Sequence, residues 1–172
     1  DYGTGGFPNP STGCIEFNAN ASAPGFIDVR NNIFINKSVN TGTSTLNHYN
    51  EMYSTSTQLL TTNSNIIDNA LTANSFVGRF AGLNYAALDT FSFAIRQAGS
   101  TGFGVVNFIA PNASTSGVNL RVGTTNAIEG MGDTTVSAFV TLDADGQTRS
   151  SFGPVDIGAN AGNYTLTADS VA

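Results

Sequence analysis

Short stretches in which apolar and polar residues alternate make up most of this chain. The clearest is LDTFSFAIR, residues 88–96, where Phe91, Phe93 and Ile95 occupy every second position. A period of two residues is typical of a β-strand with one buried face. We therefore predict a central strand over 88–96 with these three side chains in the core. The alternative is an exposed apolar strip that meets another subunit.

Residues 25–36, GFIDVRNNIFIN, show the same alternation with one interruption. Ile27, Val29, Ile33 and Ile35 are predicted to share the buried face of a strand that bends at its Asn-Asn pair. The remaining predicted strands are 14–17, 76–80, 103–110, 118–122, 135–142, 149–152 and 164–171. Turn-forming residues separate them at fairly regular spacing. Such a series predicts a mainly β domain, built as a β-sandwich or jelly roll.

Residues 47–74 show a different spacing, because their apolar residues recur three and four positions apart. This spacing is typical of a helix, with Asn47 as its cap and Glu51 in its first turn. The intervening residues are mostly Ser, Thr and Asn, which are poor helix formers, so such a helix depends on tertiary packing. We predict a helical insertion at about 47–74, with strand and loop as the alternative.

The first 13 residues, DYGTGGFPNPSTG, are rich in Gly, Pro and Ser and contain a single Phe. This composition predicts a flexible N-terminal arm over 1–13. The total length of 172 residues suits one domain. We therefore predict a single all-β domain over 14–172.

Two stretches resemble secreted right-handed parallel β-helix proteins. DADGQTRSSFGPVDIGAN, residues 143–160, is similar to the closing segment of some of these families, and VRNNIFIN, residues 29–36, is similar to one of their Asn-bearing rungs. The matching positions of the closing segment are Asp143, Asp145, Gly146, Arg149, Asp156, Ile157, Gly158 and Ala159. Those families often continue with an aromatic residue and Glu, where this chain has Asn160 and Ala161.

The resemblance covers about a sixth of the chain and implies a right-handed parallel β-helix. A solenoid normally shows a repeat of fixed period, and this sequence shows none. The β-helix is therefore the alternative to the sandwich or jelly roll. The resemblance also implies an extracellular surface protein, often a polysaccharide-related one.

Charged residues make up only 10% of the chain, against about 25% in a typical soluble domain. The six Lys and Arg residues are scattered singly, and the net charge is −6. Binding to nucleic acid or to anionic lipid needs clustered positive charge, so neither partner is expected. The 40% of hydrophobic residues can form a core. No apolar run reaches the roughly 18 residues of a membrane span.

Four Asn-x-Ser/Thr sequons, at Asn20, Asn36, Asn112 and Asn163, are candidate glycosylation sites. The chain also contains a single Lys. Together these features favour an extracellular or cell-surface protein.

The chain has one histidine, His48, and one cysteine, Cys14. One of each cannot supply the several Cys or His ligands of a zinc site. No Gly-x-Ser-x-Gly motif accompanies His48. We therefore expect no enzymatic activity and no catalytic residues, with His48 as a helix cap or surface residue. Cys14 is either a small buried apolar residue or a thiol that forms a disulfide between subunits.

The local acidic cluster is Asp143-Ala-Asp145-Gly146. Alternating Asp followed by Gly resembles the start of a calcium-binding loop, which makes Asp143 and Asp145 candidate calcium ligands. The closing Glu of such a loop is missing, and Asp-Gly also forms tight turns. The turn is the main interpretation, with Arg149 and Asp156 paired to hold it. No other cofactor is expected.

With little catalytic chemistry, the sequence favours a function that depends on surfaces. Uncharged Ser, Thr, Asn and Gly surfaces pack together without desolvating many charges. A flexible arm followed by an apolar strand can add to the open sheet of a neighbour. The first hypothesis is therefore a self-assembling extracellular structural protein, such as a filament, pilus or surface-array subunit that binds other copies of itself. The predicted subunit interface comprises Phe7, Cys14, Ile15 and Phe17.

The second hypothesis is a carbohydrate-binding module or an adhesin domain, assisted by calcium. Sugar sites commonly combine aromatic rings with Asn and Asp side chains. The candidate residues are Tyr49, Tyr53 and Tyr85, together with the Asp143–Asp145 turn. In this hypothesis the partner is a glycan rather than another copy of the chain.

Overall fold

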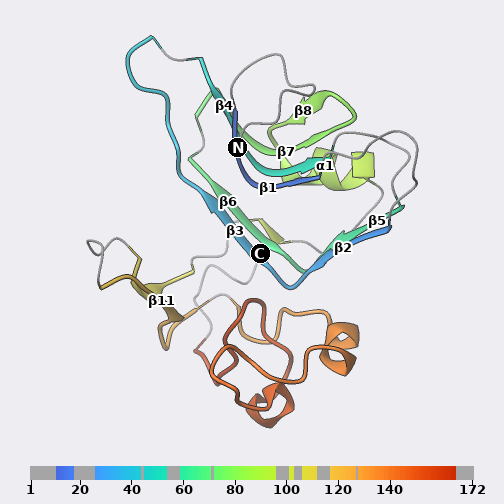
Figure 1. The fold of residues 1–172 in the computed structure, drawn as a ribbon, viewed down its shortest axis with the longest axis vertical. Helices are drawn as coiled ribbons and strands as arrows, with labels where there is room; N and C mark the ends of the chain where they lie inside the picture. The colour runs from blue at the N-terminus through green and yellow to red at the C-terminus, as the bar shows by residue number, and fades with distance from the viewer. Residues whose placement is uncertain are drawn as a thin grey trace. The chain divides into compact units, whose positions relative to one another are not determined.

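The computed structural model describes residues 11–17, 26–43, 45–53, 59–70, 72–95, 101–102, 106–111, 117–126 and 128–165. The chain is mainly β, as predicted (Figure 1). The longer strands are β1 (Ser11–Phe17), β2 (Phe26–Arg30), β3 (Ile33–Asn36), β4 (Asn47–Tyr53), β5 (Leu59–Asn63), β6 (Ile66–Asn69), β7 (Ser75–Phe80) and β11 (Asn119–Val122). The shorter ones are β8 (Leu83–Tyr85), β9 (Thr101–Gly102) and β10 (Phe108–Ala110). The helices are α1 (Leu88–Ile95) and two 3₁₀ helices, η1 (Thr134–Ala138) and η2 (Arg149–Phe152).

The strands pair in an order that repeats every three strands. The sheets of the described residues have the orders β1-β4-β7-β8, β2-β5 and β3-β6-β9, with β10 and β11 forming a separate pair. β1 pairs in parallel with β4, β4 with β7, and β6 with β9, whereas β8 runs antiparallel to β7. A sandwich or jelly roll stays unconfirmed, because both are built from antiparallel sheets.

The chain divides into two compact units. One comprises Asp1–Phe26, Phe34–Leu59 and Asp68–Gln97, and the other comprises Ile27–Ile33, Leu60–Ile67 and Ala98–Ala172. Each unit draws on three separate segments, so the chain passes repeatedly from one to the other. A single domain over 14–172 stays a prediction. Of the predicted arm, residues 1–10 lie outside the described residues, and 11–13 already belong to β1.

The predicted helical insertion at 47–74 is wrong, because this segment contains β4, β5 and β6. β4 lies between two neighbouring strands, and six of its seven residues are buried. A strand that is covered on both faces has no polar side, and therefore shows no period of two. Within the described residues, the spacings of three and four that suggested a helix include the mostly buried strands β4 and β6.

The predicted strand at 88–96 is also wrong, because Leu88–Ile95 forms the helix α1. Phe91 and Ile95 are buried one helical turn apart, while Phe93 is 87% exposed. The Phe91 amide donates to the Ala87 carbonyl at 3.1 Å, which begins the helix. A short segment with apolar residues at positions 88, 91, 93 and 95 fits both periods, so tertiary packing decides between them.

The predicted bend within 25–36 is confirmed and is sharper than expected. Asn31 has a φ of 59° and separates β2 from β3. Ile27 and Val29 are buried as predicted, but after the turn Phe34 and Asn36 are buried in place of Ile33 and Ile35. The left-handed residue thus shifts the alternation by one position, which the sequence pattern could not show.

The C-terminal strand predictions are only partly correct. The prediction at 118–122 is confirmed by β11, and that at 103–110 is confirmed for β10, while residues 103–105 lie outside the described residues. Residues 135–142 and 149–152 contain the 3₁₀ helices η1 and η2 instead of strands. Thr165 makes an isolated bridge with Thr125, and residues 166–172 lie outside the described residues.

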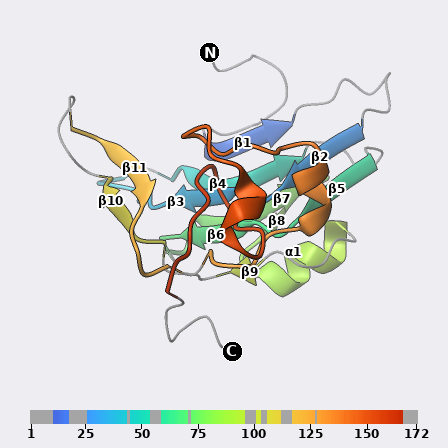
Figure 2. The ribbon, with the colours of Figure 1, turned by 90° about the horizontal axis from the view of Figure 1, so that it is seen from below.

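Each unit has its own core. In the first, Phe91 of α1 packs on the sheet beside Tyr53, with ring centroids 6.4 Å apart. A Cβ atom at Gly78 would lie 2.3 Å from the Phe91 ring, so only glycine leaves room for it. In the second, Ile66, Ile128 and Ile157 are fully buried together. Figure 2 shows β10 and β11 as a two-stranded ribbon, and Val122 of β11 packs against this second core.

The helix places Phe91 and Phe93 in opposite environments, so their truncation should have opposite consequences. We expect Phe91→Ala to lower the free energy of unfolding by about 3 to 5 kcal/mol, because it empties a buried site. Phe93→Ala is the matched control and should change it by less than about 0.5 kcal/mol. Urea unfolding followed by circular dichroism measures both. Equal losses would restore the strand prediction, in which both side chains face the core.

Candidate functional site

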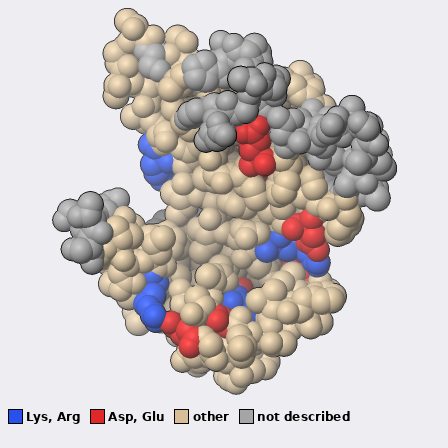
Figure 3. Space-filling model, in the orientation of Figure 1, with Lys and Arg blue, Asp and Glu red and all other residues tan. Residues whose placement is uncertain are grey.

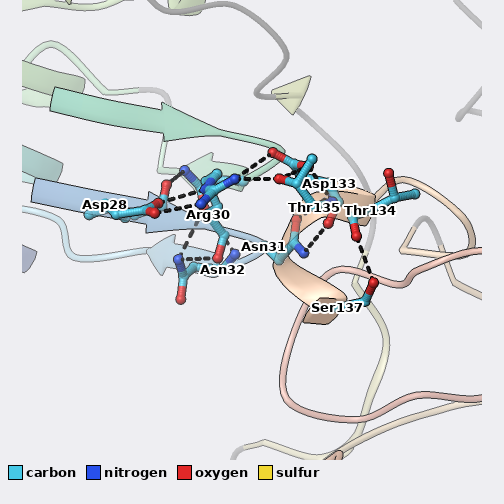
Figure 4. Close-up of polar contacts among 10 residues, drawn as sticks. Asp28, Arg30, Asn31, Asn32, Asp133, Thr134, Thr135 and Ser137 are labelled. Atoms are coloured by element: carbon cyan, nitrogen blue, oxygen red, sulfur yellow. Dashed lines mark hydrogen bonds and ion pairs between the residues drawn. The ribbon is translucent and has the colours of Figure 1, made fainter. Parts of the chain in front are cut away.

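An arginine-centred cluster joins β2 to the start of η1 (Figure 4). Arg30 makes a bidentate ion pair with Asp28, with nitrogen–oxygen distances of 2.6 and 2.5 Å. The same guanidinium donates to Asp133 at 3.0 Å and to Thr135 at 2.6 Å. These acceptors raise the pKa of Arg30, first through the hydrogen bonds that the guanidinium donates to Asp28 and Asp133. Each of the three guanidinium nitrogens donates to a protein acceptor, so the cluster is an internal clamp.

The turn next to this cluster is built from asparagine side chains. The Asn31 side chain accepts from the Asp133 amide at 2.6 Å and donates to the Asp133 carbonyl at 3.1 Å. Asn65 is fully buried, accepts from the Asn32 amide at 2.9 Å and donates to the Val29 carbonyl at 2.9 Å. Backbone groups at a buried corner need such partners. These asparagines therefore have a structural role.

Asp133 is the anionic centre of the clamp. Hydrogen bonds from the Thr135 hydroxyl and amide, followed by those from Arg30, lower the pKa of Asp133 to about 2. Its carboxylate also caps η1 by accepting from the Thr135 amide at 2.8 Å. The charged form of Asp133 is therefore the one that stabilises the fold.

The closing segment, which carries the resemblance, is held by one buried arginine. Arg149 donates to the carbonyl oxygens of Asp156, Gly158 and Ala159, at 3.0, 2.8 and 3.3 Å. The Asp156 carboxylate instead accepts from the Gly130 and Gly162 amides, both at 3.0 Å. Burial raises the pKa of Asp156, and these two amides oppose that effect. Arg149 thus contacts the backbone of Asp156 and not its carboxylate, which corrects the predicted side-chain pair.

The predicted calcium ligands Asp143 and Asp145 both have protein partners. Asp143 accepts from the amides of Asp145 and Gln147, at 2.9 and 2.8 Å. Burial would raise its pKa, but hydrogen bonds from Gln147, Ala161 and Asp145 lower it. Asp145 forms an ion pair with Arg121. The predicted turn is present, since the Gly146 amide donates to the Asp143 carbonyl and Gly146 has a φ of 76°.

Calcium binding therefore stays a prediction, with geometry that favours the turn. Among the residues that the structure describes, no three His, Cys, Asp or Glu side chains gather as a metal site would require.

The predicted interface residues lie on β1, except Phe7, which is outside the described residues. β1 pairs with β4 along one side and, among the described strands, lies at the edge of its sheet. Cys14 is exposed, whereas Ile15 and Phe17 are partly buried. Phe17 stacks on Tyr53 with ring centroids 5.6 Å apart. Along β1, Cys14 is therefore more accessible than the apolar side chains of Ile15 and Phe17.

The environment of Cys14 suppresses its reactivity. Burial of the sulfur raises the pKa of the Cys14 thiol, and the negative charge of Glu51 on β4 raises it further, to about 11. A hydrogen bond with the backbone of Ile35 lowers it only in part. Although the residue as a whole is exposed, its thiol is therefore protonated at neutral pH.

His48 is neither a helix cap nor a surface residue, which corrects the sequence prediction. It lies on β4 with only 3% of its surface exposed. Its Nδ1 is 2.8 Å from the Thr12 hydroxyl, and its Nε2 is 3.2 Å from the Asn40 side-chain oxygen. Both ring nitrogens are thus satisfied within the first unit.

A groove of about 640 Å³ lies beside α1 in the first unit. We call it the aromatic groove, and its main lining residues are Phe80, Leu83, Tyr85, Asp89, Phe93 and Ala94. Leu83 and Phe93 are 63% and 87% exposed. Sequence reasoning missed this site because it depends on α1, which was predicted as a strand. An acidic residue in the first turn of a helix, here Asp89, was the signal that could have indicated it.

The predicted sugar-binding residues are not brought together. Tyr85 lines the aromatic groove, but Tyr49 and Tyr53 are buried at 2% and 1% exposure. The Tyr49 hydroxyl donates to Asn84 at 3.0 Å, and the Tyr53 hydroxyl donates to Glu51 at 2.6 Å. Burial raises the pKa of Tyr49. These two rings belong to the core and cannot form an exposed platform.

The described sequons differ in accessibility. Asn36 is buried, and its side chain donates to the Tyr49 carbonyl at 2.8 Å and accepts from the Ser38 amide at 3.1 Å. Asn163 is exposed. Asn20 and Asn112 lie outside the described residues. Among the four candidates, Asn163 is thus a described position at which a glycan fits the folded chain.

Charge is sparse on the face shown in Figure 3, where Lys, Arg, Asp and Glu occur as small separate groups. Within the described part of the chain, no helix has both the length and the apolar character needed to cross a membrane.

Comparison with protein-family models, with curated proteins and with solved structures finds no match to this chain.

The low pKa of Asp133 makes the contribution of the clamp depend on pH. A carboxyl group whose pKa is lowered in the folded state stabilises the fold at pH values above its pKa in the unfolded chain, 3.8. This stabilisation is lost as the pH falls towards the folded-state pKa of about 2. We expect Asp133→Asn to lower the free energy of unfolding by about 1 kcal/mol at pH 7, since the group is partly exposed. The difference from wild type should vanish near pH 2.

Urea midpoints of both proteins between pH 2 and 7 measure this effect. Asp68→Asn is the matched control, since Asp68 pairs with the exposed Lys37 and should change stability by less than about 0.5 kcal/mol. A pH-independent difference for Asp133→Asn would contradict the assignment.

The raised pKa of Cys14 predicts slow alkylation in the folded chain. At pH 8 a shift from 9.0 to about 11 lowers the thiolate fraction about 100-fold. We expect iodoacetamide to react with the folded protein slower than with the urea-denatured protein by about this factor. The folded rate should rise about tenfold per pH unit up to about pH 11. Mass spectrometry after quenched reactions measures it, and a folded rate that levels off near pH 9 would contradict the assignment.

Proposed function

We propose that this chain is a subunit of an extracellular structural assembly, joined to other copies of itself by β-strand addition. The observation that carries the proposal is the position of β1 at the edge of its sheet, in the part of the chain that the structure describes. An edge strand leaves backbone N–H and C=O groups available to another strand. β1, with the sequence STGCIEF, carries neither Lys nor Pro, the residues that commonly protect such an edge.

The strand order of the described residues supports a parallel stack in which β1, β2 and β3 form the first rung. Among the residues that the structure describes, β1, β2 and β3 each stand at an edge of their sheet. At the other edge of the first sheet, β8 runs antiparallel to β7 and ends the parallel ladder. An order that repeats every three strands is what a β-helix produces, and we propose this architecture for the chain, in agreement with the resemblance of 29–36 and 143–160.

The surface composition suits an assembly outside the cell. Large apolar side chains are exposed in both units, including Phe26, Leu83, Phe93, Ile109, Leu120 and Phe139. Few charges accompany them, so a contact between copies desolvates few ions. Filament, pilus or surface-array subunits use such contacts repeatedly. The carbohydrate-binding alternative has less support, because Tyr49 and Tyr53 are buried and Asp143 and Asp145 are occupied.

A charge placed on the edge of β1 should prevent strand addition. We expect Cys14→Lys to raise the protein concentration needed for assembly about 10-fold or more, because a lysine at an edge must be desolvated when a second strand pairs with it. Light scattering and negative-stain electron microscopy of a concentration series measure the assembly.

Val39→Lys is the matched control, because Val39 is 52% exposed in the same unit and lies outside β1. It should assemble as wild type does. Urea unfolding of both variants separates an edge effect from loss of the fold. A wild-type chain that stays monomeric at all concentrations would refute the proposal, and so would a folded Cys14→Lys variant that assembles normally.

A further inference from the structure

Contact through β1 alone does not explain a growing filament. If the edge of β1 pairs with the same edge of a second copy, the contact is isologous and closes at a dimer. Continued growth needs a contact between two different surfaces. Such a contact requires a recess on one part of the chain and a complementary projection on another.

The aromatic groove supplies the recess. Phe93 and Leu83 at this groove are 87% and 63% exposed, although large apolar side chains are usually buried. Asp89 is the charged residue among the lining positions. An apolar groove with one acidic group favours an apolar partner that carries one basic group. Exposed aromatic residues in a recess are also typical of the dominant contacts in protein interfaces.

The β10–β11 ribbon supplies the projection. Its exposed aliphatic side chains are Ile109 and Leu120, which are 60% and 59% exposed, and Val118, directly before β11, is 53% exposed. Next to Leu120 is Arg121, whose side chain is 58% exposed and pairs with Asp145. A two-stranded ribbon is only marginally stable by itself. The ribbon thus combines apolar surface with a basic group, and binding to a partner would stabilise it.

We propose that the β10–β11 ribbon of one copy binds in the aromatic groove of the next. Leu120 and Ile109 contact Phe93 and Leu83, and Arg121 approaches Asp89. This inference deepens the proposed self-assembly and depends on it. The two surfaces belong to different units of the chain, so the contact is head-to-tail, and each copy keeps one free groove and one free ribbon for further growth.

A mixing experiment tests the contact with the full-length chain. Phe93→Lys blocks the groove and keeps the ribbon, whereas Leu120→Lys blocks the ribbon and keeps the groove. We expect each variant alone to need an about 10-fold or higher concentration for assembly. An equimolar mixture should form larger complexes than either variant forms alone, because the intact groove of one variant then meets the intact ribbon of the other. Sedimentation velocity measures the sizes.

Leu142→Lys is the matched control, since Leu142 is 53% exposed and lies outside both surfaces. It should assemble as wild type does. If Phe93→Lys lowers the unfolding midpoint, Phe93→Ala replaces it in the same mixture. Normal growth of either folded variant, or a mixture that behaves as the sum of its components, would overturn the inference and leave strand addition at β1 intact. A monomeric wild type would refute both proposals.

Discussion

The hydrogen bonds of the buried Asn65 side chain are the interaction on which the strand arrangement of the second unit depends. The chain must turn sharply between β2 and β3, and Asn31 does so with a positive φ. A turn of this kind leaves backbone groups without a strand partner, and burial makes each such group costly. Asn65 satisfies the Asn32 amide and the Val29 carbonyl at once. Its placement therefore fixes how the turn between β2 and β3 lies against the turn between β5 and β6.

The unusual composition of the chain follows from this requirement. Asn side chains offer both a donor and an acceptor, and here Asn31, Asn36 and Asn50 also bond to backbone groups of residues distant in sequence. They replace part of the hydrogen bonding that longer sheets would supply. A set of buried asparagines thus belongs to the interior, while the scarcity of charge is a property of the surface. Only the scarcity of surface charge has direct consequences for binding partners.

The two units stabilise the segments that follow their parallel strands in different ways. In the first, β8 turns back along β7, and α1 contacts both strands. This arrangement needs Gly78, because any side chain there would meet Phe91. In the second, the closing segment has little regular structure, and Arg149 binds three of its carbonyl groups instead. The polar residues of the closing segment therefore mainly stabilise the fold.

The sequence by itself determined the β-rich character, the strands β7 and β11, the bend at the Asn-Asn pair and the Asp-Gly turn. Each depends on local alternation or on residues with special backbone freedom, which are visible within a few positions. Only the tertiary structure decided that 47–74 forms strands and 88–95 a helix, because β4 is buried on both faces and α1 covers Gly78. The aromatic groove and the clamp around Arg30 were also beyond the sequence. Arg30 and Asp133 are 103 positions apart, and no local pattern encodes a contact over that distance.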